Sequence, residues 1–275
     1  MPKKMNQIVK ESNALARARV MPVSSTVWTE RIIAAIAAKN RIDDLTFKEH
    51  LIDIENLFPS ATENLSASQY SELKKAVEHL TRSYFQIRKS NGDFMNYPIF
   101  SKIGIKDNYI IGKFNSDLAE HYLELKKQFA IRVLPEFQVL SGTYSQQLFR
   151  YLNSWKDRIE TTIPLSELHE TLVVPASFRK DFKAFRIRVL ETAHKEITEK
   201  TSLHYEWEPV KKGLRKIIAV RFIFDIARST AAEAERQATQ EKENALKTTG
   251  ELQRLSNQCW ERLQRLKKEC TPKKS

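Results

Sequence analysis

Apolar residues recur at three- and four-residue intervals in the stretch that begins at Ser177, which is the spacing of one helix face. Ser177 is a suitable N-cap for such a helix. The apolar face consists of Phe178, Phe182, Phe185, Val189 and Ala193. The outer face and its flanks carry Arg179, Lys180, Lys183, Ala184, Arg186, Ile187 and Arg188. The pattern predicts one amphipathic helix with a basic N-terminal half, as in helices that enter the DNA major groove.

The period changes to that of strands after Thr201. Leu203 to Trp207 and Ile217 to Phe224 predict two strands. Between them Gly213 permits a tight turn. The cations around this turn, which are suited to a phosphate backbone, are Lys211, Lys212, Arg215 and Lys216. A basic helix followed by a basic hairpin is the arrangement of a winged-helix domain.

The first half of the chain shows the same order of helices and hairpin. Periodicity predicts helices over Thr26 to Lys39 and from a cap at Ser66 or Ser68 to about Ser83. The second of these has Lys74, Lys75 and Arg82 on its outer face. Strands are expected at Tyr84 to Arg88, Ile99 to Ile105 and Tyr109 to Phe114, and a short helix at Leu118 to Phe129. For Leu45 to Leu57, strand and helix cannot be separated by periodicity.

The second half begins with a helix expected over Ser145 to Trp155 and another from Ile163, with Ser166 as its cap. We therefore expect an α+β protein with two tandem winged-helix domains, although no residue-level repeat is visible. The expected boundaries are residues 1–140 for the first domain, which would dimerise and bind DNA, and 141–228 for the second, the main DNA reader. Residues 229–275 would form a helical tail.

The tail segment has no proline before Thr271 and one glycine, Gly250. Its narrow apolar stripe is Leu252, Leu255, Cys259, Leu263 and Leu266. The pattern predicts a long, mostly solvated helix. Two interpretations stay open, a tail that packs loosely and a helix that docks on a partner or self-associates.

The charge balance points to a polyanionic partner. The formal net charge is +12 and the pI is about 9.6, which favours nucleic acid. The N-terminus has no apolar core of a secretory signal, and no apolar run reaches the roughly 18 residues of a membrane helix. We therefore expect a cytoplasmic protein. Cys259 and Cys270 would lie about 16 Å apart on one helix, beyond the roughly 7 Å of a disulfide.

Enzyme and cofactor signatures are missing from the sequence. There is no Gly-x-x-x-x-Gly-Lys-Ser/Thr motif of a P-loop ATPase. The six histidines are scattered, and none forms the His-x-His pair that would hold the metal of a rolling-circle nuclease. We expect no catalytic activity, no cofactor and no metal site.

An ordered series of motifs resembles the iteron-binding plasmid replication initiators, the tandem winged-helix Rep proteins of bacteria. The N-terminal motifs are Ser12-Asn13-Ala14-Leu15-Ala16-Arg17 and Glu30-Arg31-Ile32-Ile33. The central motif is Leu148, Phe149, Tyr151, Leu152 and Trp155. The C-terminal motifs are Phe182-Lys183, Val189-Leu190, Ala193, Glu196-Ile197, Thr201 and a strand ending at Phe222. This chain departs from the family at Thr198, usually Asn, and at Leu214, which separates Gly213 from Arg215.

The resemblance implies binding to direct repeats in a plasmid origin, with each domain in the major groove about one turn from the other. It implies opening of an adjacent AT-rich duplex, recruitment of host replication proteins such as a helicase, its loader or an initiator, and autorepression by dimers bound to an inverted repeat. Carried onto this chain, base reading falls to Lys180, Lys183, Arg186, Ile187 and Arg188. Phosphate contacts fall to Arg179, Lys211, Lys212, Arg215 and Lys216, with Lys74, Lys75 and Arg82 as weaker candidates.

Two other classes stay open on the sequence. A winged-helix transcriptional repressor without a replication role would have the same DNA-binding residues. An adaptor would act mainly through the helix of Ser229 to Lys268.

Overall fold

The computed structural model describes residues 8–22, 26–41, 44–57, 66–88, 91–123, 125, 129–213, 216–232, 234–235 and 238. The chain forms two compact units, Met1–Arg228 and Ser229–Ser275. The second unit contains the predicted tail helix, and most of that helix lies outside the described residues. The few tail residues that are described, 229–232, 234–235 and 238, are helical.

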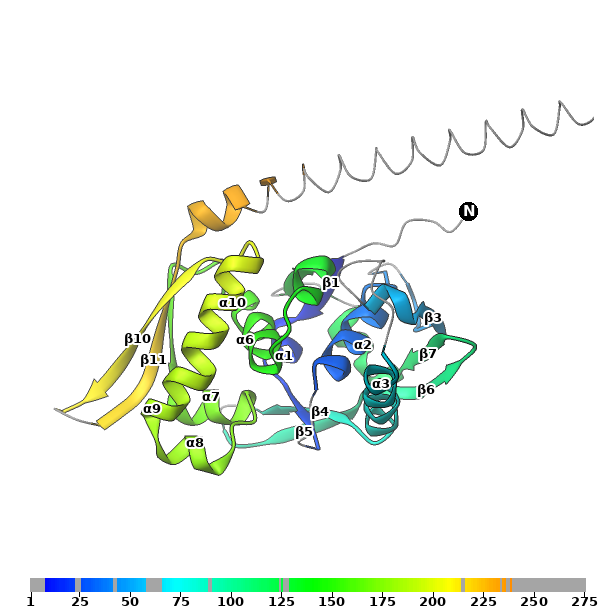
Figure 1. The fold of residues 1–275 in the computed structure, drawn as a ribbon, viewed down its shortest axis with the longest axis horizontal. Coiled ribbons are helices and arrows are strands. Elements are labelled where there is room, and N and C mark those ends of the chain that lie inside the picture. The colour runs from blue at the N-terminus through cyan, green and yellow to red at the C-terminus, as the bar shows by residue number, and fades with distance from the viewer. Residues whose placement is uncertain are drawn as a thin grey trace, which may run out of the picture. The chain divides into compact units, whose positions relative to one another are not determined.

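The first half of the large unit mixes short strands with two longer helices (Figure 1). Its strands are β1 (Ile8–Ser12), β2 (Arg19–Met21), β3 (His50–Asp53), β4 (Tyr84–Arg88), β5 (Phe94–Pro98), β6 (Phe100–Lys106), β7 (Tyr109–Phe114) and β8 (Phe129–Val133). Its helices are α1 (Asn13–Ala16), α2 (Val27–Ala37), η1 (Ile54–Leu57), α3 (Ala67–Leu80), η2 (Ser116–Leu118), α4 (Ala119–Tyr122) and α5 (Leu134–Gln138).

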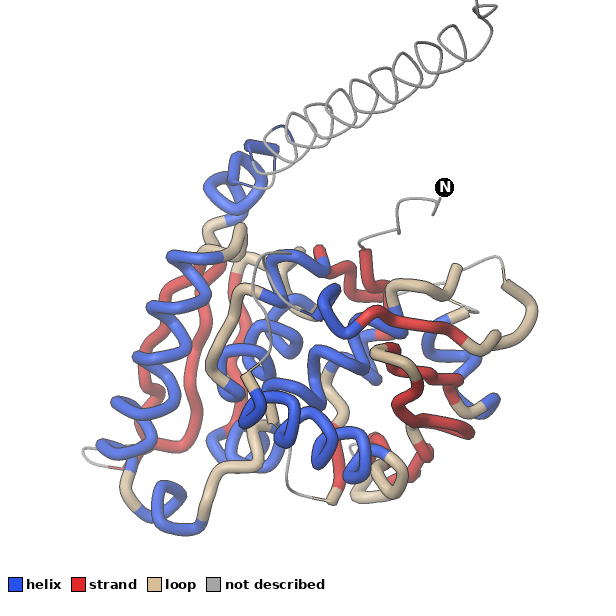
Figure 2. Tube along the Cα trace, turned by 45° about the vertical axis from the view of Figure 1, so that its right-hand side comes forward, coloured by secondary structure: helices blue, strands red, loops and turns tan. Residues whose placement is uncertain are grey.

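The second half is simpler. It contains α6 (Thr143–Asn153), β9 (Glu160–Pro164), α7 (Leu165–Thr171), α8 (Ala176–Lys180), α9 (Phe182–Phe185), the π-helical η3 (Arg186–Glu191), α10 (Thr192–Lys200), β10 (Tyr205–Lys212) and β11 (Lys216–Phe224). Figure 2 shows the helical run that ends in α10 lying along the strands of this half.

The two halves share one sheet topology. The first has the strand order β3-β7-β6 and the second β10-β11-β9. In the first half, β3 precedes the short helix η1 and pairs with β7. In the second half, β9 precedes the short helix α7 and pairs with β11. The last strand of each hairpin, β7 or β11, is therefore the central strand. In the second half the hairpin directly follows the helical run that ends in α10, whereas in the first half β4 and β5 lie between the long helix α3 and the hairpin of β6 and β7. This is the winged-helix arrangement twice over, and it confirms the predicted fold class for the described residues.

Side-chain caps explain where the two main helices of the first domain begin. The Thr26 hydroxyl accepts from the backbone N–H of Thr29, and the backbone N–H of Thr26 donates to the Thr29 hydroxyl in return. Ser66 and Gln69 form the same capping box before α3. The apolar stripe of α3 is buried as predicted, and Lys74, Lys75 and Arg82 are exposed. The predicted strands Tyr84–Arg88 and Tyr109–Phe114 are confirmed as β4 and β7.

Several local predictions were wrong. The helix expected over Leu118 to Phe129 is the single turn α4, and the chain then enters strand β8 at Phe129. Pro164, not Ser166, precedes α7, and Pro175, not Ser177, precedes α8. A proline fixes its own φ and suits these positions. The segment Leu45 to Leu57, left open by the sequence, is β3 followed by η1.

The predicted single helix from Ser177 is also divided. It breaks at Asp181, whose backbone is extended (φ −124°, ψ 99°) and whose side chain accepts from the N–H of Lys183 at 2.9 Å, capping α9. Beyond Phe185 the helix widens into the π-helical turn η3. Thr192 Oγ1 donates to Ile187 O at 2.9 Å, and Arg186 pairs with Glu191, both at the five-residue spacing of a π-helix.

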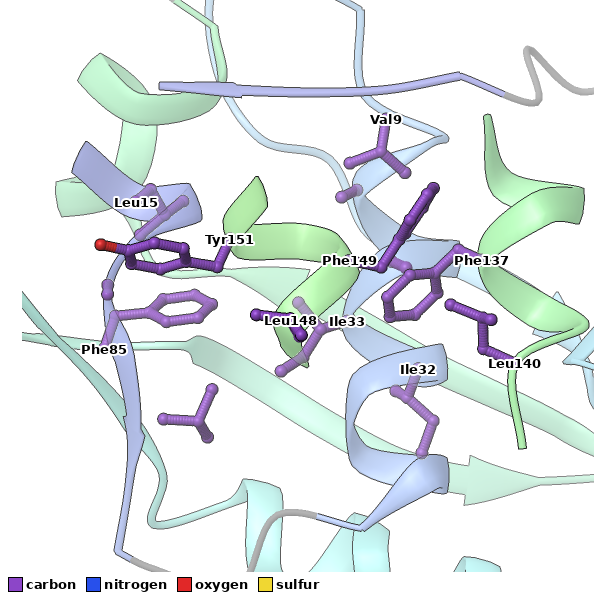
Figure 3. Close-up of a cluster of buried hydrophobic side chains, with 14 of the residues drawn as sticks. Val9, Leu15, Ile32, Ile33, Phe85, Phe137, Leu140, Leu148, Phe149 and Tyr151 are labelled. Atoms are coloured by element: carbon purple, nitrogen blue, oxygen red, sulfur yellow. The ribbon is translucent and has the colours of Figure 1, made fainter. Parts of the chain in front are cut away.

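One buried helix, α6, joins the two domains. Figure 3 shows its Leu148, Phe149 and Tyr151 among Ile33 of α2 and Phe85 of β4. All of these side chains are at most 2% exposed. Because α6 contacts both α2 and α10, the cores of the two domains are continuous within residues 1–228.

A buried ion cluster fixes α6 in this position. The Arg150 guanidinium bonds Glu11 of β1 in a bidentate manner at 3.3 Å, donates to Leu15 O at 2.7 Å and lies 4.0 Å from Glu30 of α2. Burial lowers the pKa of Arg150, but the two carboxylates outweigh it and raise that pKa overall. Removing Arg150 would take the buried guanidinium away from both carboxylates, a loss that typically costs about 3–5 kcal/mol.

The N-terminus of α6 is capped from a distant helix. Gly142, its N-cap residue, has no side chain, and Glu196 of α10 accepts from the N–H groups of Ser141 (2.7 Å) and Gly142 (3.2 Å). A β-carbon on Gly142 would lie 2.8 Å from Ser145 Oγ and 3.0 Å from Glu196 Oε2, so a larger residue there would displace these capping side chains. Desolvation raises the pKa of Glu196, but hydrogen bonds from Ser145, Ser141 and Lys200 lower it to about 2.

The run of helices from α8 to α10, which contains the predicted base-reading residues and is called the reading helix below, packs its aromatic rings on the core. Phe185 is fully buried, whereas Phe182 is only partly buried against the same core. Phe185→Ala should therefore destabilise the protein by about 3–5 kcal/mol, and Phe182→Ala by less than about 2 kcal/mol. Urea unfolding measures both, and equal losses would contradict this placement of the two rings.

The second prediction concerns acid. Because the pKa of Glu196 is about 2 in the folded protein and near 4.5 ordinarily, its stabilisation is complete above pH 4.5 and is lost as the pH falls toward 2. Glu196→Gln should reduce stability by about 1–3 kcal/mol at pH 7 and by much less at pH 3. Glu199→Gln, an exposed neighbour on α10, is the control. A Glu196→Gln loss of the same size at both pH values would show that the carboxylate charge is not what matters.

Candidate DNA interface

The reading helix of the second domain presents its cations at the end near the wing, the hairpin turn of β10 and β11. Figures 1 and 2 both place α8 and α9 beside the tip of this hairpin. Lys180, Lys183, Arg186, Ile187 and Arg188 are all exposed, as the predicted reading surface requires. The structure therefore brings the predicted reading residues and the predicted wing to one end of the domain.

These side chains differ in how freely they can meet DNA. Lys180 and Lys183 form no ion pair within the described part of the chain. The Arg186 side chain pairs with Glu191 at 3.2 Å, and both are nearly half exposed. Arg188 lies over the ring of Phe178 at 5.8 Å. Exposed pairs of this kind are worth about 1 kcal/mol or less, so DNA can displace them.

Arg179 is held by hydrogen bonds within the protein. Its Nε donates to Val174 O at 2.6 Å, and its Nη2 donates to His169 O at 3.3 Å. These carbonyls belong to the C-terminal end of α7 and the residues after it, so Arg179 ties the two helices together. Its remaining guanidinium N–H groups are the ones left for a phosphate.

The wing of the second domain has a left-handed residue at its turn. Gly213 has φ +67°, a conformation that glycine adopts without strain. Lys211, Lys212 and Lys216 are exposed, and Lys212 pairs with Lys216 across the hairpin. A β-bulge lies between Val210 and Lys211. The remaining predicted wing cation, Arg215, lies outside the described residues.

The first domain has a corresponding basic surface on α3 and on its wing, with fewer cations. On α3, Lys74 lies 4.8 Å from the centre of the Tyr70 ring, and Lys75 and Arg82 are exposed. The wing of β6 and β7 turns at Asp107 and Asn108, both with positive φ. It carries three exposed lysines that were not among the predicted DNA-binding residues, Lys102, Lys106 and Lys113. The turn signal at Lys106-Asp107-Asn108, between two predicted strands, was the available clue.

Other kinds of site find no support in the described residues. Within them, no group of three or more His, Cys, Asp or Glu side chains is placed to hold a metal ion. In the same residues, no helix is both long enough and apolar enough to span a membrane.

Two winged-helix domains with cations on their long helices and hairpins define a protein of the tandem winged-helix, DNA-binding class. Two family models match the chain, "Initiator Replication protein, WH1" over residues 8–153 and "Initiator Rep protein, WH2" over residues 164–224. The chain belongs to this family of replication initiator proteins.

One solved structure shares the fold. The Pi initiator protein in complex with iteron DNA is 19% identical, with a TM-score of 0.64, over 81% of this chain and 98% of that one. Domains 2–3 of RctB are 12% identical, with a TM-score of 0.40, over 84% of this chain and 96% of that one. A search of curated proteins gives no match.

Proposed function

We propose that this chain is a plasmid replication initiator that binds double-stranded DNA at directly repeated origin sites, the iterons. The observation that carries the proposal is the pair of winged-helix domains with one sheet topology. Both have exposed cations on the long helix, α3 in the first domain and the run α8 to α10 in the second, and on the wing. The similarity of the fold to the iteron-bound Pi initiator supports it.

The proposed base contacts and phosphate contacts are assigned from the positions of the exposed side chains. The residues that would face base edges are exposed in the first half of the helical run from α8 to α10. They are Lys180 at the end of α8, Lys183 on α9, and Arg186, Ile187 and Arg188 on η3. The wing cations, the free donors of Arg179 and the α3 cations Lys74, Lys75 and Arg82 would contact phosphates. The shared helix α6 would hold the two domains at a fixed separation, which suits two major-groove segments about one helical turn apart.

The finer steps belong to the same proposal. Binding to several repeats would promote opening of an adjacent AT-rich duplex and recruit host replication proteins in the cytoplasm. A dimer formed through the first domain would bind an inverted repeat and repress the initiator's own gene. The domain limits 1–140, 141–228 and 229–275, with the tail free to dock on a partner, are part of this scheme. No step in it requires catalysis or a cofactor.

The competing function is a transcriptional repressor without a role in replication. Footprinting of the purified protein on the DNA beside its own gene, across a salt series, separates the two. For an initiator we expect regularly phased protection over direct repeats, with preference over random DNA persisting at higher salt. Protection of a single palindrome would favour the repressor, and binding without any preferred site would contradict both.

Two substitutions test the reading surface. Arg186→Ala should reduce the difference in affinity between DNA sites, because a bidentate Arg–guanine contact contributes about 1–3 kcal/mol of discrimination. Lys212→Ala should weaken binding to all DNA alike and reduce the slope of log affinity against log salt by about 0.9. Titrations of a protected duplex and of a mixed-sequence duplex measure both effects.

The matched control is Lys195→Ala, an exposed cation in the C-terminal half of the same helical run. It should leave both site preference and salt slope close to wild type. If Arg186→Ala only lowers affinity uniformly, η3 is not the reading segment.

A further inference from the structure

An arginine cluster lies at the seam between the two domains, outside both predicted reading surfaces. Arg19 of β2 and Arg88 of β4 both approach Glu170 of α7, at 3.6 and 3.9 Å. Both also donate to Gln86 Oε1, Arg19 from Nη2 at 2.6 Å and Arg88 from Nε at 3.1 Å. Gln86 in turn donates to Asn96 of β5 at 3.1 Å. The cluster therefore joins the first-domain sheet to the second domain.

Positive charge is in excess in this cluster. Two guanidinium groups share one carboxylate, and Arg179 is close enough to act on Arg19 as well. Burial is the main cause that lowers the pKa of Arg19, followed by the charge of Arg88, while Glu170 opposes them. Another anion would therefore be favoured at this point.

Arg88 is the member that an external anion can reach. Its side chain is 49% exposed, and that of Glu170 is 42% exposed, whereas the Arg19 side chain is 15% exposed. The Arg88–Glu170 separation of 3.9 Å exceeds that of a hydrogen bond. A long, solvated ion pair contributes little, and a phosphate oxygen can replace it with a charge-assisted bond.

The chain topology places the cluster between the two reading helices. Strand β4 begins at Tyr84, just after α3 ends at Leu80, and α7, which carries Glu170, comes just before α8. Figure 1 shows β4 and β5 between α7 and α3. Two helices that read major-groove segments about one turn apart leave a stretch of duplex between them, and its backbone would pass this seam.

We propose that the seam arginines form a third DNA contact, in which Arg88, supported by Arg19, binds a backbone phosphate between the two major-groove segments. In the free protein Arg88 faces the Glu170 carboxylate, and a phosphate oxygen takes that carboxylate's place when DNA binds. This inference rests on the proposed function, because it needs both reading helices on one duplex.

The first test is Arg88→Gln, with Lys48→Gln as the matched control. Lys48 is also an exposed cation paired with one carboxylate, Asp44, at 2.9 Å. On the duplex identified by footprinting, Arg88→Gln should bind about fivefold more weakly at 0.15 M salt, with the salt slope reduced by about 0.9. Lys48→Gln should keep the wild-type slope, and an unchanged slope for Arg88→Gln overturns the inference.

Glu170→Gln distinguishes a DNA contact at this cluster from a cluster that only holds the two domains together. If Glu170 competes with phosphate for Arg88, its neutralisation should tighten DNA binding by about two- to fivefold, and Asp44→Asn, the control, should not. If the cluster only holds the domains together, Glu170→Gln should weaken binding as Arg88→Gln does, which overturns the inference. Urea midpoints of all four variants show whether any loss of binding is a loss of folding.

Failure of the inference and failure of the proposed function give different results. Wild-type protein that prefers the footprinted duplex over a mixed-sequence duplex, together with seam variants that match their controls, overturns only the seam contact. Wild-type protein without any preference overturns both.

Discussion

The burial of Arg150 between two carboxylates is the constraint on which the rest of the architecture depends. Its partners Glu11 and Glu30 come from β1 and α2 of the first domain, while Arg150 itself lies on α6. A buried charge must keep its partners or cost several kcal/mol, so α6 cannot move away from the first domain without a large penalty. Because α6 also packs on α10, this one cluster fixes the position of the helix on which α10 rests.

The same helix is held from the other side by Glu196, which caps α6 from α10. Glu136 of α5 adds a second link, accepting from Ser202 N at 3.2 Å and Ser202 Oγ at 2.9 Å. These polar contacts are directional, so they set orientation as well as distance. A rigid separation between two reading helices is what binding to one face of a duplex demands.

Basic residues of similar appearance in the sequence serve different purposes in the fold. Arg150 is buried and structural, and Arg179 uses part of its guanidinium to donate to Val174 O. Lys180 and Lys183 are exposed without an ion pair in the described residues. Net charge predicted the kind of partner, but the sorting of cations into structural and accessible ones depends on which backbone carbonyls and carboxylates surround them.

The sequence by itself determined the long helices α2, α3 and α6, the hairpins β6–β7 and β10–β11 and the basic outer face after Pro175, because these follow from local periodicity, caps and turns. It did not reveal β1, β2, β5, β8 or β9, which are short strands whose pairing partners are distant along the chain or lie in other short strands. It also did not reveal the break at Asp181 or the seam of Arg19, Arg88 and Glu170. Those features were decided by the tertiary structure, since burial and long-range ion pairing act only once distant segments are packed together.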